Sequence, residues 1–117
     1  MNASDRLVIK GMLEYCEKIQ NRIDEFHIDE NSFIENSALA DMLLMPVFQI
    51  GELANALSDE YVQSNMGMPW HAIRGFRNVI AHDYAVVDAS WAWNTIQIDI
   101  PALCDFLQSE LESLSDV

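Results

Sequence analysis

Apolar residues recur along this chain at alternating spacings of three and four, and this period constrains the fold more than any other feature. In the first segment the stripe consists of Ile9, Met12, Cys16, Ile19, Ile23 and Phe26. Such a spacing places all of these side chains on one face of an α-helix, while the charged residues fall on the other faces. Ser4 suits the N-cap and Asp5 the first turn, so we expect this helix to begin at Ser4.

The same period predicts further helices in the middle of the chain. Ser32 and Glu35 have the spacing of a capping box, so a second helix is expected to start at Ser32. The stripe then resumes through Leu39, Leu43, Val47, Ile50, Ala54, Leu57 and Tyr61. Pro46 lies inside this stripe and removes one helical hydrogen bond, so we expect a kink or a split near 42–46.

Two more helices are expected in the last third. The segment SNMGMPW, with Gly67 and Pro69, has the composition of a loop, and the next helix is predicted from about Trp70 to His82. Asp88 suits the N-cap of the last helix, and Pro101 predicts a bend in it. The core side of that helix is marked by Ile96, Ile100, Leu103, Leu107, Leu111 and Leu114.

No segment alternates with period two over more than a few residues, and no repeat or linker divides the chain. At this length, folding buries roughly 65% of the surface that the open chain exposes, which is enough for one core. We therefore predict one all-α domain over residues 1–117, an up-and-down helical bundle of four to five helices.

Charge and cysteine content exclude several classes of function. Nineteen acidic and six basic residues give a formal net charge of -13, which repels DNA, RNA and anionic membranes at long range. A local cationic pocket remains possible because salt screens charges beyond about 8–10 Å. Cys16 and Cys104 form no CxxC pair and are expected to be reduced core cysteines. We expect a cytoplasmic protein without a metal, a cofactor, a membrane span or a DNA partner.

The stretch RGFRNVIAHDY holds two of the six basic residues and one of the three histidines. Asn78 and His82 are four residues apart and can touch on a helix. Arg77 and His82 are five apart, which is about 140° around a regular helix. Their side chains converge only if the helix ends near His82, and the following Asp83 and Tyr84 are compatible with such an end.

These residue types can cleave RNA without a metal. His82 can move a proton, Arg77 can bind a phosphate bidentately, and Asn78 can orient the imidazole or hold a phosphate oxygen. Tyr84 offers a hydroxyl group and a ring on which a base can stack. The RNA's own 2′-hydroxyl would be the nucleophile. The residues alone also fit a structural role, because Arg and His are favourable at helix ends.

A resemblance favours the catalytic interpretation. RNVIAHDY is similar to the signature of the HEPN superfamily, which has Arg, a polar residue, a short spacer, His, one residue and Tyr. The blocks IGELANALSDEY, MPWHAIRGFRN and VDASWAWNTIQIDIPALCDFL resemble successive blocks of HepT-like proteins within that superfamily. The resemblance covers about residues 50–107, with a looser match in the first helix.

The resemblance implies a HEPN-like dimer in which Arg77, Asn78 and His82 of both subunits line one cleft. It implies the toxin of a toxin–antitoxin pair, an endoribonuclease in which His82 handles the proton and Arg77 binds the scissile phosphate. It also implies a partner, a minimal nucleotidyltransferase of the MntA type, which transfers AMP from ATP to Tyr84 and silences the toxin.

Two other functions stay open at this point. The chain could be a non-catalytic substrate-binding or acceptor subunit of a minimal nucleotidyltransferase, or a helical dimer without activity.

Trp91 and Trp93 are two residues apart and face different sides of a helix, which hints at a second buried surface. Outside the motif we expect His71 at the surface, Trp70 packed under its helix start, and Glu52 either paired or solvated.

Overall fold

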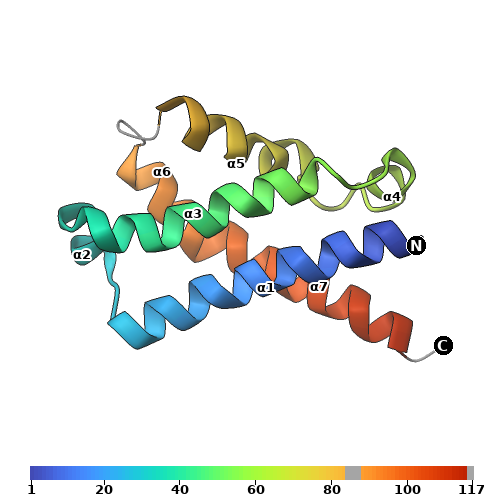
Figure 1. Cartoon of the computed structure of the whole chain (residues 1–117), viewed down its shortest axis with the longest axis horizontal. Coiled ribbons are helices and arrows are strands. Elements are labelled where there is room, and N and C mark those ends of the chain that lie inside the picture. Colours follow the sequence, from blue (N-terminus) through green and yellow to red (C-terminus); the bar gives the residue numbers. More distant parts are fainter. Residues whose placement is uncertain (84–87, 116–117) are drawn as a thin grey trace.

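The computed structural model describes residues 1–83 and 88–115, without the side chains of residues 82, 83, 114 and 115. All secondary-structure elements within these two ranges are helices, and they pack as a bundle with extents of 46 × 29 × 20 Å (Figure 1). The all-α prediction and the helical bundle are therefore confirmed.

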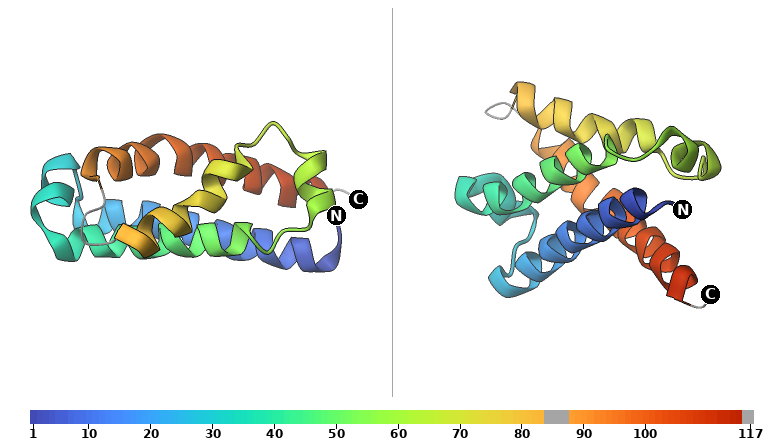
Figure 2. Two further views of the ribbon diagram at one scale, coloured as in Figure 1. Left: turned by 90° about the horizontal axis from the view of Figure 1, so that it is seen from above. Right: turned by 45° about the vertical axis from the view of Figure 1, so that its right-hand side comes forward.

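The helices are α1 (Ala3–Phe26), α2 (Glu30–Glu35), α3 (Ser37–Ala54), α4 (Asp59–Ser64), α5 (Trp70–Asp83), α6 (Ala89–Asn94), the π-helix η2 (Thr95–Asp99) and α7 (Ile100–Ser115). Helix α3 packs between α1 and α5. The α6, η2 and α7 segments follow one another as a long helical run that crosses behind α1 and α3 (Figures 1 and 2). The start of α1 and the end of α7 lie at the same end of the bundle (Figure 1).

The predicted apolar stripes form the core. Fully or almost fully buried positions on the long helices include Ile9, Met12, Cys16, Ile19, Leu43, Val47, Ile50, Ala54, Ile96, Ile100, Leu103 and Leu107. Of the other described stripe positions, Ile23, Leu39 and Leu111 are partly buried, and Phe26, in the last turn of α1, is 44% exposed. The Leu114 side chain lies outside the described residues. The period of three and four therefore identifies the core side of each long helix.

Two predicted helix starts are wrong by a few residues. The N-cap of α1 is Asn2, whose Oδ1 accepts from the Asp5 backbone N–H at 2.6 Å, so Ser4 lies inside the first turn. The N-cap of α2 is Asp29, which exchanges hydrogen bonds with Ser32 in a capping box. Hydrogen bonding by the backbone and the side chain of Ser32 lowers the pKa of the Asp29 carboxyl group. In both segments an earlier polar residue takes the cap. The prediction for Asp88 as the N-cap of α6 is confirmed.

Pro46 does not split α3, which is continuous from Ser37 to Ala54. A proline at this position leaves the carbonyl four residues earlier, that of Met42, without its helical donor. The Arg22 Nη1 atom of α1 donates to this carbonyl at 2.5 Å. A side chain of the neighbouring helix thus satisfies the acceptor that the proline exposes.

Pro101 follows a change of helix type. The π-helix η2 ends at Asp99, and the Ile100 backbone N–H donates to the Thr95 carbonyl five residues back. Because proline can neither donate to the preceding turn nor fit closely against it, the wider π-turn before Pro101 is a way to continue the helix. The sequence predicts a bend at this proline, and the feature observed next to it is this π-turn.

Helix α3 is, in the described ranges, the one helix long and apolar enough to cross a membrane by length and composition alone. It packs against both α1 and α5, and its stripe lies in the core of the bundle. A core helix passes the same composition test, so we interpret α3 as the central helix of the fold.

The two neighbouring tryptophans both have aromatic partners within the chain. Trp91 meets Phe76 edge-on at 6.2 Å between ring centroids, and Trp93 lies 5.3 Å from Phe33. Both indoles pack against the core and are partly buried. The hint of a second buried surface that their spacing gave is therefore explained by α2 and α5 of the same chain.

Candidate active site on α5

Helix α5 is fixed to the bundle by one face. Ile73, Phe76 and Ile80 are each at most 4% exposed and point into the core. Trp70 anchors the start of the helix: it is 3% exposed, and its Nε1–H donates to the Asn65 carbonyl at 2.9 Å. The packing of Trp70 under the helix start is confirmed. A helix held in this way presents its remaining faces at a fixed orientation.

The two arginines of the motif stretch have different roles. Arg74 is half-buried, and its Nε donates to the Ala54 carbonyl at 3.1 Å while its Nη2 donates to the Leu57 carbonyl at 3.4 Å. These carbonyls belong to the end of α3 and the turn after it, which a cation stabilises. Arg74 is therefore a structural residue of the α3 C-terminus.

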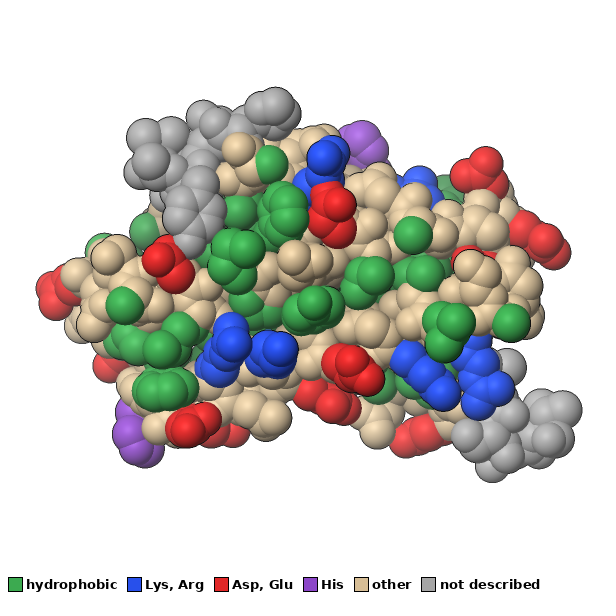
Figure 3. Space-filling view, viewed as in Figure 1, with side chains coloured by type: hydrophobic (Ala, Val, Ile, Leu, Met, Phe, Trp, Pro, Cys, Tyr) green, Lys and Arg blue, Asp and Glu red, His purple; other side chains and the backbone are tan. Residues whose placement is uncertain are grey.

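Arg77 is open to solvent. Its side chain is 50% exposed, and its Nε atom forms an ion pair with Oε1 of Glu52 on α3, whose side chain is 40% exposed. Asn78, the next residue, is exposed as well. Figure 3 shows the basic surface of α5 adjoining acidic surface where α5 meets α3. The paired form of Glu52, one of the two expected, is the one observed.

The contact between α3 and α5 depends on Gly51. A Cβ atom at this position would lie 2.7 Å from the Arg77 backbone N and 3.2 Å from the Ile73 carbonyl oxygen. No larger residue fits without moving one of the two helices. The glycine therefore lets the backbone of α3 touch α5 at Arg77, and it places the adjacent Glu52 beside the arginine.

We expect Gly51→Ala to destabilise the fold by about 1–3 kcal/mol, because the added methyl group overpacks a backbone contact. The measurement is the free energy of unfolding from urea titrations. Gly75→Ala in α5 is the matched control, since a Cβ there meets nothing within 4 Å. That change should be neutral or stabilising by up to about 1 kcal/mol. Equal effects of the two substitutions would contradict the assigned role of Gly51.

The other predicted site residues lie at the end of the described part of this helix or after it. α5 is described as far as Asp83 and so includes His82. The predicted end of the helix near His82 falls at residues outside the described ranges. The His82 side chain and the whole of Tyr84 lie outside the described residues. The convergence of His82 with Arg77 and Asn78, and the role of Tyr84, therefore remain predictions from the motif.

The basic residues are concentrated despite the acidic composition. All six are on α1 or α5: Arg6, Lys10, Lys18, Arg22, Arg74 and Arg77. These two helices flank α3, and Lys and Arg surface appears along both in the same view (Figure 3). In α5 the first acid is its last residue, Asp83. This helix is thus the part of an acidic chain that is best suited to approach a phosphate.

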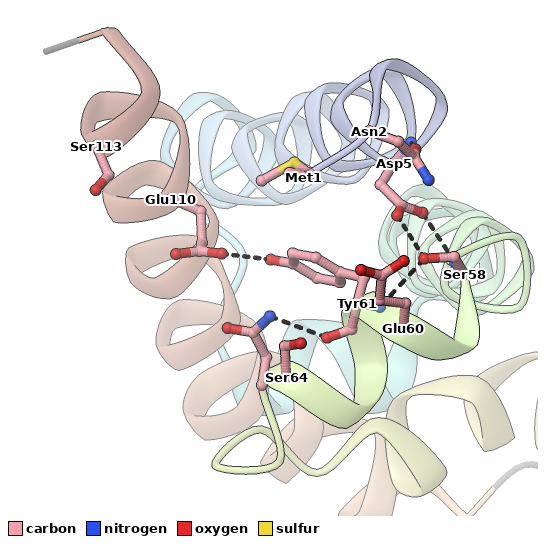
Figure 4. Close-up of a pocket in the computed structure, with 10 residues that line it drawn as sticks. Met1, Asn2, Asp5, Ser58, Glu60, Tyr61, Ser64, Glu110 and Ser113 are labelled. Atoms are coloured by element: carbon pink, nitrogen blue, oxygen red, sulfur yellow. Dashed lines mark hydrogen bonds between the residues drawn. The ribbon is translucent and has the colours of Figure 1, made fainter. Parts of the chain in front are cut away.

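A separate pocket of about 350 Å³ lies where α1, α4 and α7 meet (Figure 4). Asp5, only 2% exposed, accepts from the backbone N–H and the hydroxyl of Ser58 at 2.8 and 2.6 Å. The Tyr61 hydroxyl donates to Glu110 at 2.7 Å. The pKa of Tyr61 is raised mainly by burial, and further by this hydrogen bond. These contacts join the two ends of the chain to α4. An acidic lining does not suit a phosphate.

The cysteines offer no nucleophile. Cys16 is buried on α1 and Cys104 is half-buried on α7, and both are free thiols. Burial is the largest cause that raises the pKa of each thiol, so the reactive thiolate is scarce at neutral pH. Within residues 1–83 and 88–115, no three His, Cys, Asp or Glu side chains are grouped to hold a metal ion.

A family model described as "Ribonuclease HepT-like" matches residues 12–110, a span that contains the entire motif from Arg77 to Tyr84. The chain belongs to the HepT-like ribonuclease family. The resemblance to HepT-like proteins is therefore confirmed over residues 12–110, which include the first helix from Met12 onward.

Curated relatives of this HepT-like chain cover most of its length. It is 26% identical over 97 residues to a candidate RNase of Methanocaldococcus jannaschii, covering 81% of this chain and 89% of the relative. It is 26% identical over 98 residues to a candidate RNase of Caldanaerobacter subterraneus subsp. tengcongensis, covering 84% and 86%. No solved structure matches the chain.

The sequence alone did not identify Gly51 as a functional residue, nor the pairing of Glu52 with Arg77. One signal was available, because a glycine in the middle of an otherwise apolar helix usually has a packing reason. The sequence could not show which helix would make that close approach.

Proposed function

We propose that this HepT-like chain is a metal-independent endoribonuclease, the toxin of a toxin–antitoxin pair that acts in the cytoplasm. The observation that carries the proposal is the family match over residues 12–110, which includes the complete motif. The half-exposed Arg77, with Asn78 beside it on a helix free of acids before Asp83, supports it. So do the names of relatives as candidate RNases.

In the proposed reaction the 2′-hydroxyl oxygen of the RNA attacks the adjacent phosphorus. A new P–O bond forms, the bond to the 5′-oxygen breaks, and the products carry a 2′,3′-cyclic phosphate and a 5′-hydroxyl. His82 moves the proton, taking it from the nucleophile or giving it to the leaving oxygen. Arg77 binds the non-bridging oxygens as their charge increases, and Asn78 orients the imidazole or holds one oxygen.

The proposed active unit is a homodimer in which both copies of Arg77, Asn78 and His82 line one cleft. Positions 77 and 82 are about 140° apart on a regular helix, so two facing copies of α5 could surround a substrate better than one. Two chains of net charge -13 repel each other. The lack of acids in α5 before Asp83, and the 40% exposure of Val79, favour a contact near this helix.

The proposed regulator is an MntA-like nucleotidyltransferase that transfers AMP from ATP to Tyr84. The tyrosine oxygen attacks the α-phosphate of ATP, an ester bond forms, and pyrophosphate leaves. A phosphate and an adenine attached two residues after His82 would occupy the place of an RNA phosphate and base, and would repel the RNA electrostatically.

One experiment tests both activity and regulation. The purified chain is assayed for RNA cleavage in excess EDTA, before and after incubation with the partner transferase and ATP, and its intact mass is measured each time. We expect cleavage before incubation, one AMP per chain after it, and a loss of cleavage that parallels the modification. Tyr84→Phe should cleave RNA and remain unmodified. Modification of a chain that never cleaves RNA would contradict the enzyme and support the acceptor subunit.

A further inference from the structure

The ion pair between Glu52 and Arg77 is more than a surface contact. The Oε1 atom of Glu52 is shielded from solvent and has no hydrogen-bond partner among the described residues. The positive charge of Arg77, whose Nε atom faces this oxygen, therefore compensates its loss of hydration. Without such a partner, shielding a carboxylate oxygen from water costs free energy, so the Glu52 side chain is favoured in positions where it stays next to the arginine.

The backbone restricts this pair further. Gly51 brings α3 within van der Waals contact of α5 at the Arg77 backbone N, so the two Cα atoms that carry the pair belong to touching helices. Ile50 and Ala54 on α3 and Phe76 on α5 are almost completely buried and fix both helices to the core. The carboxylate is therefore held in place by rigid elements.

The geometry leaves part of the guanidinium for a substrate. A guanidinium has five N–H donors, and Glu52 faces Arg77 through Nε. The arginine side chain is still 50% exposed. Its two terminal amino groups can therefore meet a phosphate bidentately while the carboxylate restrains the other side.

We propose that Glu52 is a positioning residue for Arg77, which holds the guanidinium in one orientation toward the scissile phosphate and at the same time weakens RNA binding. This inference rests on the proposed ribonuclease function. The two effects have different physical causes. Orientation comes from the restraint at Nε, whereas the weaker binding comes from a negative charge next to the place that a phosphate occupies.

The test is Glu52→Gln, which keeps the shape of the side chain and removes its charge. Steady-state cleavage should show KM lower by about 2–5-fold, the scale of an exposed charge contact. The same factor should appear in the Kd for a 2′-O-methyl RNA, which cannot be cleaved. The kcat should fall on the order of 10-fold, because the arginine loses its restraint. A residue that only stabilised the fold would not lower both the KM and the kcat of the folded chain.

Glu52→Asp separates the two effects. Aspartate keeps the charge but is one methylene shorter, so KM should remain near the wild-type value while kcat falls. Glu25→Gln on α1 is the charge control. This substitution changes the net charge of the chain by the same amount, but Glu25 is an exposed residue of a different helix and is not paired with Arg77. In an Arg77→Ala chain, Glu52→Gln should have no further effect on kcat.

The outcomes separate this inference from the proposed function. A wild-type chain that cleaves no RNA in EDTA overturns the ribonuclease and the inference with it. A wild-type chain that cleaves RNA, combined with unchanged kcat and KM in both Glu52 variants, overturns the positioning role alone. A higher kcat in Glu52→Gln has the same consequence, because it would make the carboxylate an inhibitor of Arg77 instead of its support.

Discussion

His82→Ala is expected to lower the rate of RNA cleavage by about 10²–10⁴-fold, the usual contribution of a general acid or base. Binding of RNA should change little, because Arg77, which is assigned to bind the phosphate, is still present. The measurement is the single-turnover cleavage rate in EDTA, together with the Kd for a 2′-O-methyl RNA. Expression of the variant in cells should no longer inhibit growth.

His71→Ala is the matched control for this prediction. His71 is an exposed histidine on the same helix, eleven residues before His82, and no role in catalysis is assigned to it. Its removal should leave the cleavage rate within about twofold, as is usual for a change at an exposed residue. A His82→Ala chain that is folded, still cleaves at the wild-type rate and still inhibits growth would contradict the assigned role.

Arg77→Ala is expected to lower kcat by about 10²–10³-fold, the loss seen when one preorganised donor to a developing charge is removed. It should also leave the shielded Glu52 Oε1 without its compensating charge. We therefore expect a second effect on the free energy of unfolding of about 1 kcal/mol, limited by the half-exposure of the pair. Cleavage assays and urea titrations measure the two effects separately.

Arg74→Ala distinguishes a catalytic arginine from a structural one. Arg74 lies three residues earlier and donates to the carbonyls of Ala54 and Leu57. Its removal should lower the free energy of unfolding by about 1–3 kcal/mol, because two carbonyls lose a charged donor. Cleavage per folded molecule should stay within a few-fold of wild type. The reverse pattern, with Arg74 essential for kcat and Arg77 dispensable, would contradict the site as described.

The sequence predicts the helices well because a period of three and four is a local property that each segment carries by itself. The helix starts are less certain from sequence because two polar residues compete at short range, as Asn2 and Ser4 do before α1. Pro46 shows a different limit. Its effect on α3 depends on Arg22 of α1, which satisfies the carbonyl that the proline exposes and lies 24 residues earlier.

Some features of the candidate site can likewise be predicted from the sequence, and others depend on contacts between helices. The motif from Arg77 to Tyr84 is local and can be read from the sequence, and so can the helix that carries Arg77 and Asn78. The different roles of Arg74 and Arg77 cannot be predicted from the sequence, because they depend on where α3 ends against α5. The position of Glu52 depends on the close backbone approach at Gly51, a contact between segments about 25 residues apart.

The most direct test of the central claim is the chemistry of the products that the purified wild-type chain makes from a defined oligonucleotide in excess EDTA. Mass spectrometry is applied to an all-ribo substrate and to the same sequence with 2′-O-methyl groups. If the 2′-hydroxyl attacks while Arg77 binds the phosphate and His82 moves the proton, the ribo substrate should give fragments that end in a 2′,3′-cyclic phosphate. The 2′-O-methyl strand should remain intact. Cleavage of both strands, or no cleavage of either by the folded, unmodified chain, would contradict the account.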